Sequence, residues 1–224
     1  KISPETSNHE ERDRFVLSKG HGAPALFQVL AHKGFFPASD LEQFGKNGSV
    51  FHEHPPKPGL IKGIEAATGS LGHGMPMALG FALASRITKF NYRVYALLSD
   101  GECNEGTIWE SAMLASAQKI SNLTIIIDYN KWQATGRSQE IFALEPFKKK
   151  WEAFGWHTEE INGHSFEELS SAFKNARSEI NRPTAIIAHT IKGKGISFME
   201  DDNNWHYRTP NDEEFKAALK ELNN

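Results

Sequence analysis

The sequence predicts an α/β domain with a mainly parallel sheet and helices on both faces. Short apolar runs rich in β-branched residues alternate with stretches of helical periodicity about 10–15 residues long, which is typical of strand–helix–strand units. The chain has 224 residues and no internal repeat or low-complexity tract. We therefore expect a single domain over 1–224, with a polar lead-in at 1–13 and a helical tail at 207–224.

The first half of the chain begins with helical spacing of apolar and small residues at 23–33. Residues 46–63 are rich in Gly and Pro, which predicts a long surface loop of the kind that often has a function. Three glycines within 69–74 precede a helix of small residues at 75–87. The apolar run at 93–99 is expected to be a buried strand.

The middle of the chain repeats this alternation. A helix is expected at 107–118, followed by a strand at 123–129, where Ile and Thr dominate. A further helix at 147–154 leads into a strand at 155–161. These elements predict neighbouring parallel strands whose carboxyl ends lie at one edge of the sheet, where ligands bind in such folds.

The last third begins with Ser165, which Glu168 follows three residues later, a capping-box pattern that predicts a helix over 165–179. The run at 183–190 predicts another strand, and 213–222 an amphipathic helix.

Composition excludes several function classes. Lys and Arg number 25 and Asp and Glu 28, so the net charge of −3 argues against nucleic-acid binding through the phosphate backbone. No apolar run approaches the about 18 residues that span a bilayer, so no membrane role is expected. Cys103 is the single cysteine, which excludes a disulfide within the chain and favours a cytoplasmic location.

Two polar positions that follow neighbouring predicted strands are the first candidate site. Asp100 and Gly101 follow one strand, and Asn130 follows the next. A carboxylate and an amide oxygen at one sheet edge suit Mg²⁺ or Ca²⁺, completed by phosphate and water. Both segments also contain common turn formers, so two ordinary turns remain an alternative at this point.

Several motifs, taken in order, resemble the N-terminal, diphosphate-binding domain of transketolase. The matching segments are 14–22 (RFVLSKGHG), 65–74 (EAATGSLGHG), 99–106 (SDGECNEG) with Asn130 thirty residues after Asp100, and 193–199 (GKGISFM) ahead of Trp205 and His206. The resemblance extends over about residues 12–206. One departure is Ser99, where the thiamine diphosphate motif has glycine. The resemblance implies the thiamine diphosphate-binding fold.

The resemblance also implies roles for individual residues. Asp100, Asn130 and the backbone carbonyl of Trp132 would bind Mg²⁺, with Ca²⁺ or Mn²⁺ as possible substitutes. The positions that would contact thiamine diphosphate are His21, Gly69, Ser70, Leu71, Gly101 and His206.

Four residues, two of them already named, concern substrate and intersubunit contacts. His21 and His206, with His54, are the implied catalytic positions, and Glu105 would connect the two cofactor sites across the subunit interface. In this sequence Glu53 replaces the glycine that precedes the family's substrate-contacting histidine, so His52 competes with His54 for that role.

No position matches the glutamate of the pyrimidine-binding domain that activates the cofactor. The resemblance therefore implies the N-terminal subunit of a split transketolase, which forms a dimer of heterodimers with a C-terminal subunit. The implied reaction transfers a two-carbon ketol unit from a ketose or ketose phosphate to an aldose. The alternatives are a fragment of a full-length enzyme, a component of a deoxyxylulose phosphate synthase or 2-oxoacid dehydrogenase, and a non-catalytic binding module.

Overall fold

A five-stranded sheet forms the centre of the chain in the computed structural model, which describes residues 2–223. All four strand pairs are parallel. In spatial order the strands are β1 (Arg14–Leu17), β2 (Val94–Ser99), β3 (Leu123–Tyr129), β7 (Thr184–His189) and β6 (His157–Asn162). Four of these strands match the predicted ones to within two residues at each end. β1 was not predicted, because a four-residue strand that begins with Arg14 has no clear periodicity.

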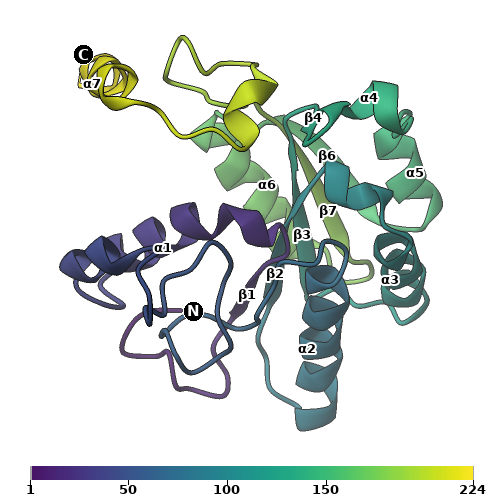
Figure 1. Cartoon of the computed structure of the whole chain (residues 1–224). Helices are drawn as coiled ribbons and strands as arrows, with labels where there is room; N and C mark the ends of the chain where they lie inside the picture. The colour runs from purple at the N-terminus through teal and green to yellow at the C-terminus, as the bar shows by residue number, and fades with distance from the viewer. Residues whose placement is uncertain (1, 224) are drawn as a thin grey trace.

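Helices cover both faces of this sheet, as predicted (Figure 1). The α-helices are α1 (Ala23–His32), α2 (Gly74–Thr88), α3 (Gly106–Ala117), α4 (Ser138–Ile141), α5 (Phe147–Ala153), α6 (Phe166–Ser178) and α7 (Asp212–Leu222). Helices α2, α3 and α5 lie against one face, and α1 and α6 lie on the side of the other. Short 3₁₀ helices occupy Gly20–Gly22, Ala38–Gln43, Gly101–Asn104 and Asn203–His206. No helix among residues 2–223 combines the length and apolarity needed to cross a membrane.

The main core lies between the sheet and helices α2, α3 and α5. Its largest side chains include Trp151 and Trp156, which are fully buried with ring centroids 5.2 Å apart. A smaller cluster lies under α6. A third cluster joins α1 to the Gly- and Pro-rich segment, where Phe27 packs edge-on against Phe51. The predicted surface loop at 46–63 is therefore anchored by buried apolar side chains and not only solvated.

Helix capping differs in one detail from the prediction. The Ser165 side chain caps α6 by accepting from the Glu168 backbone N–H. The Glu168 carboxylate, however, accepts from the Asn162 backbone N–H at 2.7 Å, so the reciprocal half of the predicted capping box is missing. A complete capping box occurs instead at α7, between Asn211 and Glu214.

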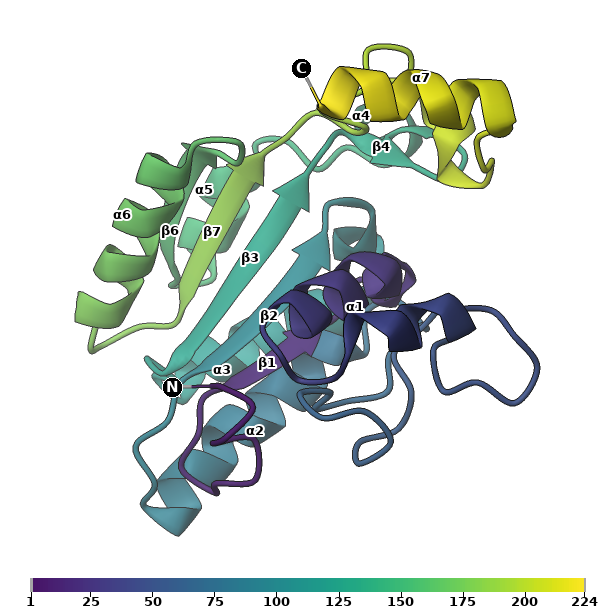
Figure 2. The same cartoon turned by 90° about the vertical axis from the view of Figure 1, so that its left-hand side faces the viewer.

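A two-stranded antiparallel hairpin follows β3. It consists of β4 (Trp132–Gln133) and β5 (Gly136–Arg137). Figure 2 shows this hairpin beyond the carboxyl end of β3, close to the yellow C-terminal segment. The hairpin was not predicted, since two-residue strands leave no periodic signal.

Candidate functional site

The candidate site lies at the carboxyl edge of the sheet. Ser99 and Asp128 are partners in the β2–β3 register, so the segments that follow these two strands start side by side. Asp100 follows β2 directly, and Asn130 follows β3 directly. The predicted adjacency of these two positions is therefore present in the structure.

Asp100 is completely buried, and its carboxylate is surrounded by hydrogen-bond donors. Its Oδ1 accepts from the Gly101 N–H at 3.0 Å, and its Oδ2 accepts from the Lys131 N–H at 3.0 Å and from the Ser138 hydroxyl at 2.7 Å. Burial raises the pKa of Asp100 to about 6, although these hydrogen bonds act in the opposite direction. A nearby cation would favour the ionised carboxylate.

The oxygen atoms around Asp100 fit a hard divalent cation. The Asn130 Oδ1 accepts from the Trp132 N–H at 2.9 Å, which fixes the turn that carries the Trp132 carbonyl. A carboxylate, an amide and a backbone carbonyl are the ligand types that Mg²⁺ takes when phosphates and waters complete its shell. Within residues 2–223 no group of three His, Cys, Asp or Glu side chains could hold a metal. The donor set therefore suits an ion shared with a phosphate ligand.

Gly101 lies against the hairpin, where a Cβ atom would stand 2.9 Å from Gln133 Cγ. The Gln133 amide nitrogen is buried and has no hydrogen-bond partner among residues 2–223. An unpaired buried donor costs free energy until it finds an acceptor. A phosphate oxygen bound beside Gly101 is an acceptor of the right chemistry, so the cradle fits the diphosphate that the resemblance implies.

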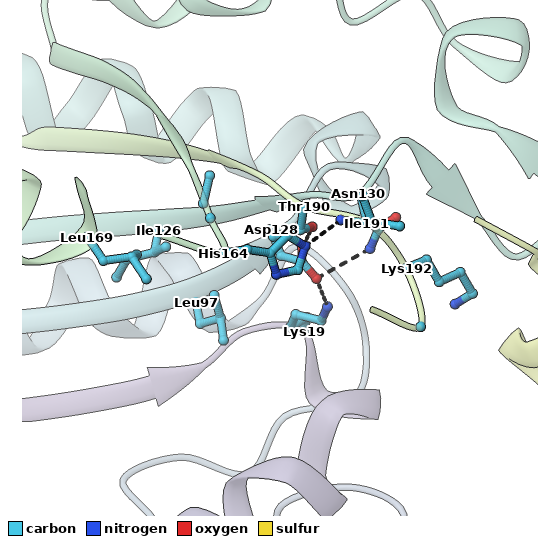
Figure 3. Close-up of a pocket in the computed structure, with 13 residues that line it drawn as sticks. Lys19, Leu97, Ile126, Asp128, Asn130, His164, Leu169, Thr190, Ile191 and Lys192 are labelled. Carbon is cyan, nitrogen blue, oxygen red and sulfur yellow. Dashed lines mark hydrogen bonds and ion pairs between the residues drawn. The ribbon is translucent and has the colours of Figure 1, made fainter. Parts of the chain in front are cut away.

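A cavity of about 560 Å³ opens beside this cradle (Figure 3). Lys19 Nζ forms a 2.6 Å ion pair with Asp128 Oδ2, and the Thr190 hydroxyl donates to Asp128 Oδ1. Burial alone would raise the pKa of Asp128, but the Lys19 ammonium and the hydrogen bonds lower it. Leu97, Ile126 and Leu169 line the opposite side of the cavity. The cavity thus has a charged side and an apolar side.

Two of the histidines predicted for the site, His21 and His206, lie near the side of the cavity that contains Lys19. The ring centroids of His21 and His206 are 5.7 Å apart, and Lys192 Nζ lies 3.4 Å from His206 Nδ1. Partial burial lowers the pKa of His21 to about 4, and the neighbouring cations add to this effect. Burial, followed by Lys192 and Lys19, also lowers the pKa of His206. Both shifts favour the neutral imidazole, in which one ring nitrogen donates a hydrogen bond and the other accepts one.

The segment Gly69–Leu71 is held between β1 and α3. The Thr68 hydroxyl donates to the Leu17 carbonyl at 2.6 Å, and the Thr107 hydroxyl donates to the Gly72 carbonyl at 2.8 Å. The His54 ring lies against Gly69, because a Cβ there would come within 3.0 Å of His54 Cδ2. This contact favours His54 over His52 as the histidine of the site.

Glu105, the N-cap residue of α3, is exposed at the side of the same segment. A Cβ on Gly72, whose φ is 82°, would meet the Glu105 side chain at 2.6 Å. The Glu105 stem therefore packs on this segment, while the side chain remains accessible to another chain.

Sequence reasoning missed one central residue, Glu102. Its side chain is fully buried and accepts from the Ser18 hydroxyl at 2.5 Å, the Gly72 N–H at 2.9 Å and the Ser99 N–H at 3.4 Å. Burial raises the pKa of this carboxyl despite these bonds. Glu102 thus joins the segments after β1, before α2 and at the end of β2.

Lys19 and Lys192 were also missed as site residues, although both lie beside predicted motifs. The available signal was position: Lys19 lies two residues before His21, and Lys192 directly before the Gly193 motif. Only the fold brings these two cations to one cavity.

Comparison with known proteins extends these observations. A family model described as "Transketolase, thiamine diphosphate binding domain" matches residues 1–223. The chain is 43% identical to the 6-deoxy-6-sulfo-D-fructose transketolase subunit SqwG of Clostridium sp. (strain MSTE9), covering 99% of this chain and 80% of that protein. It is 38% identical to an apulose-4-phosphate transketolase subunit of Phocaeicola vulgatus, with 99% and 78% covered.

The chain is also similar to longer transketolases and to their solved structures. The chain is 44% identical to the transketolase of Homo sapiens over 87% of its own length and 30% of that protein. The crystal structure of the transketolase from Campylobacter jejuni superposes with a TM-score of 0.93 at 31% identity, covering 100% of this chain and 36% of that one. The chain therefore spans about a third of the length of these two transketolases.

Proposed function

The chain belongs to the transketolase family, and we propose that it is the N-terminal subunit of a split transketolase that anchors thiamine diphosphate together with Mg²⁺. The observation that carries this proposal is the adjacency of Asp100 and Asn130 at the carboxyl edge of the sheet, in a chain whose family match extends over residues 1–223. Two relatives that it matches over almost its full length are named as subunits.

The metal would be held by Asp100, the Asn130 side chain and the Trp132 carbonyl. Mg²⁺ is the proposed ion, and Ca²⁺ or Mn²⁺ could replace it. The buried Asp100 carboxylate supplies the single negative charge of this set. A divalent ion with one protein carboxylate retains positive charge, which suits it to bridging a diphosphate.

The diphosphate would lie between Gly101 and the histidines. The close approach of Gly101 to Gln133 leaves no space for a side chain, so a glycine here keeps the backbone of the turn accessible to a ligand beside the unpaired Gln133 amide nitrogen. His21 and His206 reach the same region as neutral rings that donate hydrogen bonds without adding charge. Lys19 and Lys192 supply the cationic field.

The ring system and the substrate would be positioned by the adjacent segment. Gly69, Ser70 and Leu71 would contact the aminopyrimidine and thiazolium rings through their backbone, and His54 would contact the sugar. When bound, thiamine diphosphate supplies the electron sink for breaking and forming the carbon–carbon bond, while the protein orients it. In this proposal the chain binds the cofactor, orients it and excludes water from it.

The remaining part of the active site would come from a C-terminal subunit with a pyrimidine-binding domain. We propose that this partner supplies the glutamate that activates the cofactor, that Glu105 connects the two cofactor sites across the interface, and that the assembly is a dimer of heterodimers. The exposed position of Glu105 at the start of α3 supports an intersubunit role. We further propose that the assembly works in the cytoplasm.

The proposed reaction transfers a two-carbon ketol unit from a ketose to an aldose. Two relatives are named for sugars with an acidic group, a sulfonate in 6-deoxy-6-sulfo-D-fructose and a phosphate in apulose-4-phosphate. We therefore propose a donor ketose that carries an anionic group. The names of these relatives favour transketolase over the deoxyxylulose phosphate synthase and 2-oxoacid dehydrogenase alternatives.

Calorimetric titration of thiamine diphosphate tests the proposal, with Mg²⁺ present and with or without the partner subunit. We expect tight binding in the mixture, and loss of Mg²⁺-dependent binding in Asp100→Ala and Asn130→Ala. Asp212→Ala, at the exposed start of α7, is the matched control and should bind like wild type.

Two results would contradict parts of this proposal. Wild-type affinity in Asp100→Ala would exclude the metal assignment. Ketol transfer by the purified chain alone would exclude a split enzyme, and no binding with or without the partner would favour a non-catalytic module.

A further inference from the structure

Asp201 connects two segments of the site that are far apart in sequence. Arg137 of β5 donates to Asp201 through both ends of its guanidinium, with Nη1–Oδ1 2.7 Å and Nη2–Oδ2 2.6 Å. The Trp132 indole N–H of β4 donates to Asp201 Oδ1 at 2.8 Å. The Arg137 guanidinium also stacks on the Trp132 ring, 3.7 Å from its centroid. One carboxylate thus accepts three hydrogen bonds from the hairpin.

The backbone around Asp201 shows that its position is specified by the fold. Its φ of 56° lies in the left-handed region, which residues other than glycine seldom adopt. Its N–H donates to the Lys192 carbonyl at 2.9 Å, which closes the loop 192–201. At Gly193, a Cβ atom would meet the Met199 carbonyl at 2.3 Å, so the inside of the loop is closely packed. The loop therefore presents the Asp201 side chain to the hairpin in a fixed direction.

Each of the two connected segments contains groups assigned above to the site. The hairpin contains the Trp132 carbonyl, the proposed third metal ligand. The segment after β7 contains Lys192 and His206, whose side chains lie 3.4 Å apart. A second bridge runs in parallel, from the Asn203 amide to the Ala134 carbonyl at 3.2 Å. Asp201 is consequently the link between the metal side and the cationic side of the site.

We propose that Asp201 is a positioning residue that acts through Arg137 and Trp132 to hold the hairpin and the segment 191–206 in the arrangement that binds the cofactor. This inference rests on the proposed function, in which these segments surround thiamine diphosphate. The Arg137 and Asp201 side chains are 35% and 53% exposed. Exposed ion pairs add little to the free energy of unfolding. We therefore expect the loss of Asp201 to change local order and cofactor affinity more than global stability.

The test compares Asp201→Ala with Glu179→Ala. Glu179 pairs with Arg182 at 3.0 Å, just before β7 and therefore at the opposite edge of the sheet, which makes it a matched control. The first readout is hydrogen exchange in the cofactor-free chain at the backbone amides of Ser138 and residue 201, which donate to Lys131 and Lys192. We expect about tenfold faster exchange at both amides in Asp201→Ala and no change in Glu179→Ala.

The second readout is the dissociation constant of thiamine diphosphate in the presence of Mg²⁺ and the partner subunit. We expect it to increase about tenfold in Asp201→Ala and by a smaller factor in Arg137→Ala, which keeps the Trp132–Asp201 hydrogen bond. The double variant should show no further increase over Asp201→Ala, because both substitutions act on the same link. Arg137→Lys keeps the positive charge and loses the two parallel N–H donors, so its dissociation constant should lie between those of wild type and Arg137→Ala.

The outcomes separate this inference from the proposed function. Unchanged exchange, or wild-type cofactor affinity in Asp201→Ala, would overturn the positioning role. If the wild-type assembly binds no thiamine diphosphate, the proposed function fails, and the exchange rates in the cofactor-free chain alone then decide whether Asp201 holds the two segments.

Discussion

Substitution of Gly20 by alanine tests how closely two segments of the site approach each other. Gly20 lies in the turn after β1 and is buried. A Cβ at this position would stand 2.6 Å from the Gly69 nitrogen and 2.7 Å from the Thr68 carbonyl carbon, whereas ordinary Cβ contacts begin at 3.4 Å. Because these neighbours are backbone atoms, they cannot rotate away. The segment containing Gly69 would have to move by about 3.4 − 2.6 = 0.8 Å.

The energetic cost follows from this displacement. Overpacking a closely packed site costs about 1–3 kcal/mol, and a backbone contact belongs at the upper end, about 3 kcal/mol. For a chain of this size each kcal/mol lowers the melting temperature by about 2–4 °C, so we expect a decrease of about 6–12 °C. A shift approaching 1 Å in a binding segment also reduces catalysis by up to about 100-fold.

Gly22→Ala is the matched control in the same turn. Its Cβ would lie 3.7 Å from the Leu17 and Lys19 side chains, an ordinary contact, so only the loss of a glycine N-cap is expected, at most about 1 kcal/mol. Urea unfolding and thiamine diphosphate titration compare the two variants. A free energy of unfolding for Gly20→Ala within about 0.5 kcal/mol of the control would refute the reasoning.

Three further predictions concern stability and protonation. Gly80→Ala, on the exposed face of α2 where nothing lies within 4 Å of the new Cβ, should raise the free energy of unfolding by about 0.5–1 kcal/mol in urea, and a decrease would contradict this. Thr124→Val should add about 1 kcal/mol in thermal unfolding, because the buried Thr124 hydroxyl has no partner among residues 2–223 and faces the equally unpaired Thr184 across the register. A loss of stability would show that the hydroxyl is hydrogen-bonded. By NMR, His21 in the cofactor-free chain should titrate near pH 4 and not near 6.5. Because this folded pKa lies below the ordinary value, the stabilisation from the neutral ring is complete above pH 6.5 and is lost as the pH falls towards 4.

The strands could be predicted where burial dominates the sequence. β3 was predicted with its observed bounds, since LTIIIDY is almost continuously buried and β-branched. β1 and the β4–β5 hairpin were missed because strands of four and two residues are too short for periodicity to show. Short elements of this kind are specified by tertiary contacts, which a single sequence does not display.

The same limit applies to the site. The adjacency of Asp100 and Asn130 could be predicted, because each directly follows a recognisable strand. Glu102 could not, since a glutamate in a polar turn resembles a solvated residue until the fold buries it against Ser18 and Gly72. The contact of His54 with Gly69, on which the preference for His54 over His52 depends, is likewise visible only in the fold.

The shared carboxylate of Glu102 has a consequence for engineering the substrate specificity of the proposed enzyme. The Glu102 side chain accepts hydrogen bonds from donors in three separate segments. If only one of these segments is replaced with a homologous sequence, the new segment has to match a carboxylate that the other two segments still hold in place. Chimeras should therefore exchange the turn after β1, the segment before α2 and the turn after β2 as one unit. The loop that carries His54 has no bond to this carboxylate among the described residues, which makes it the segment to diversify alone.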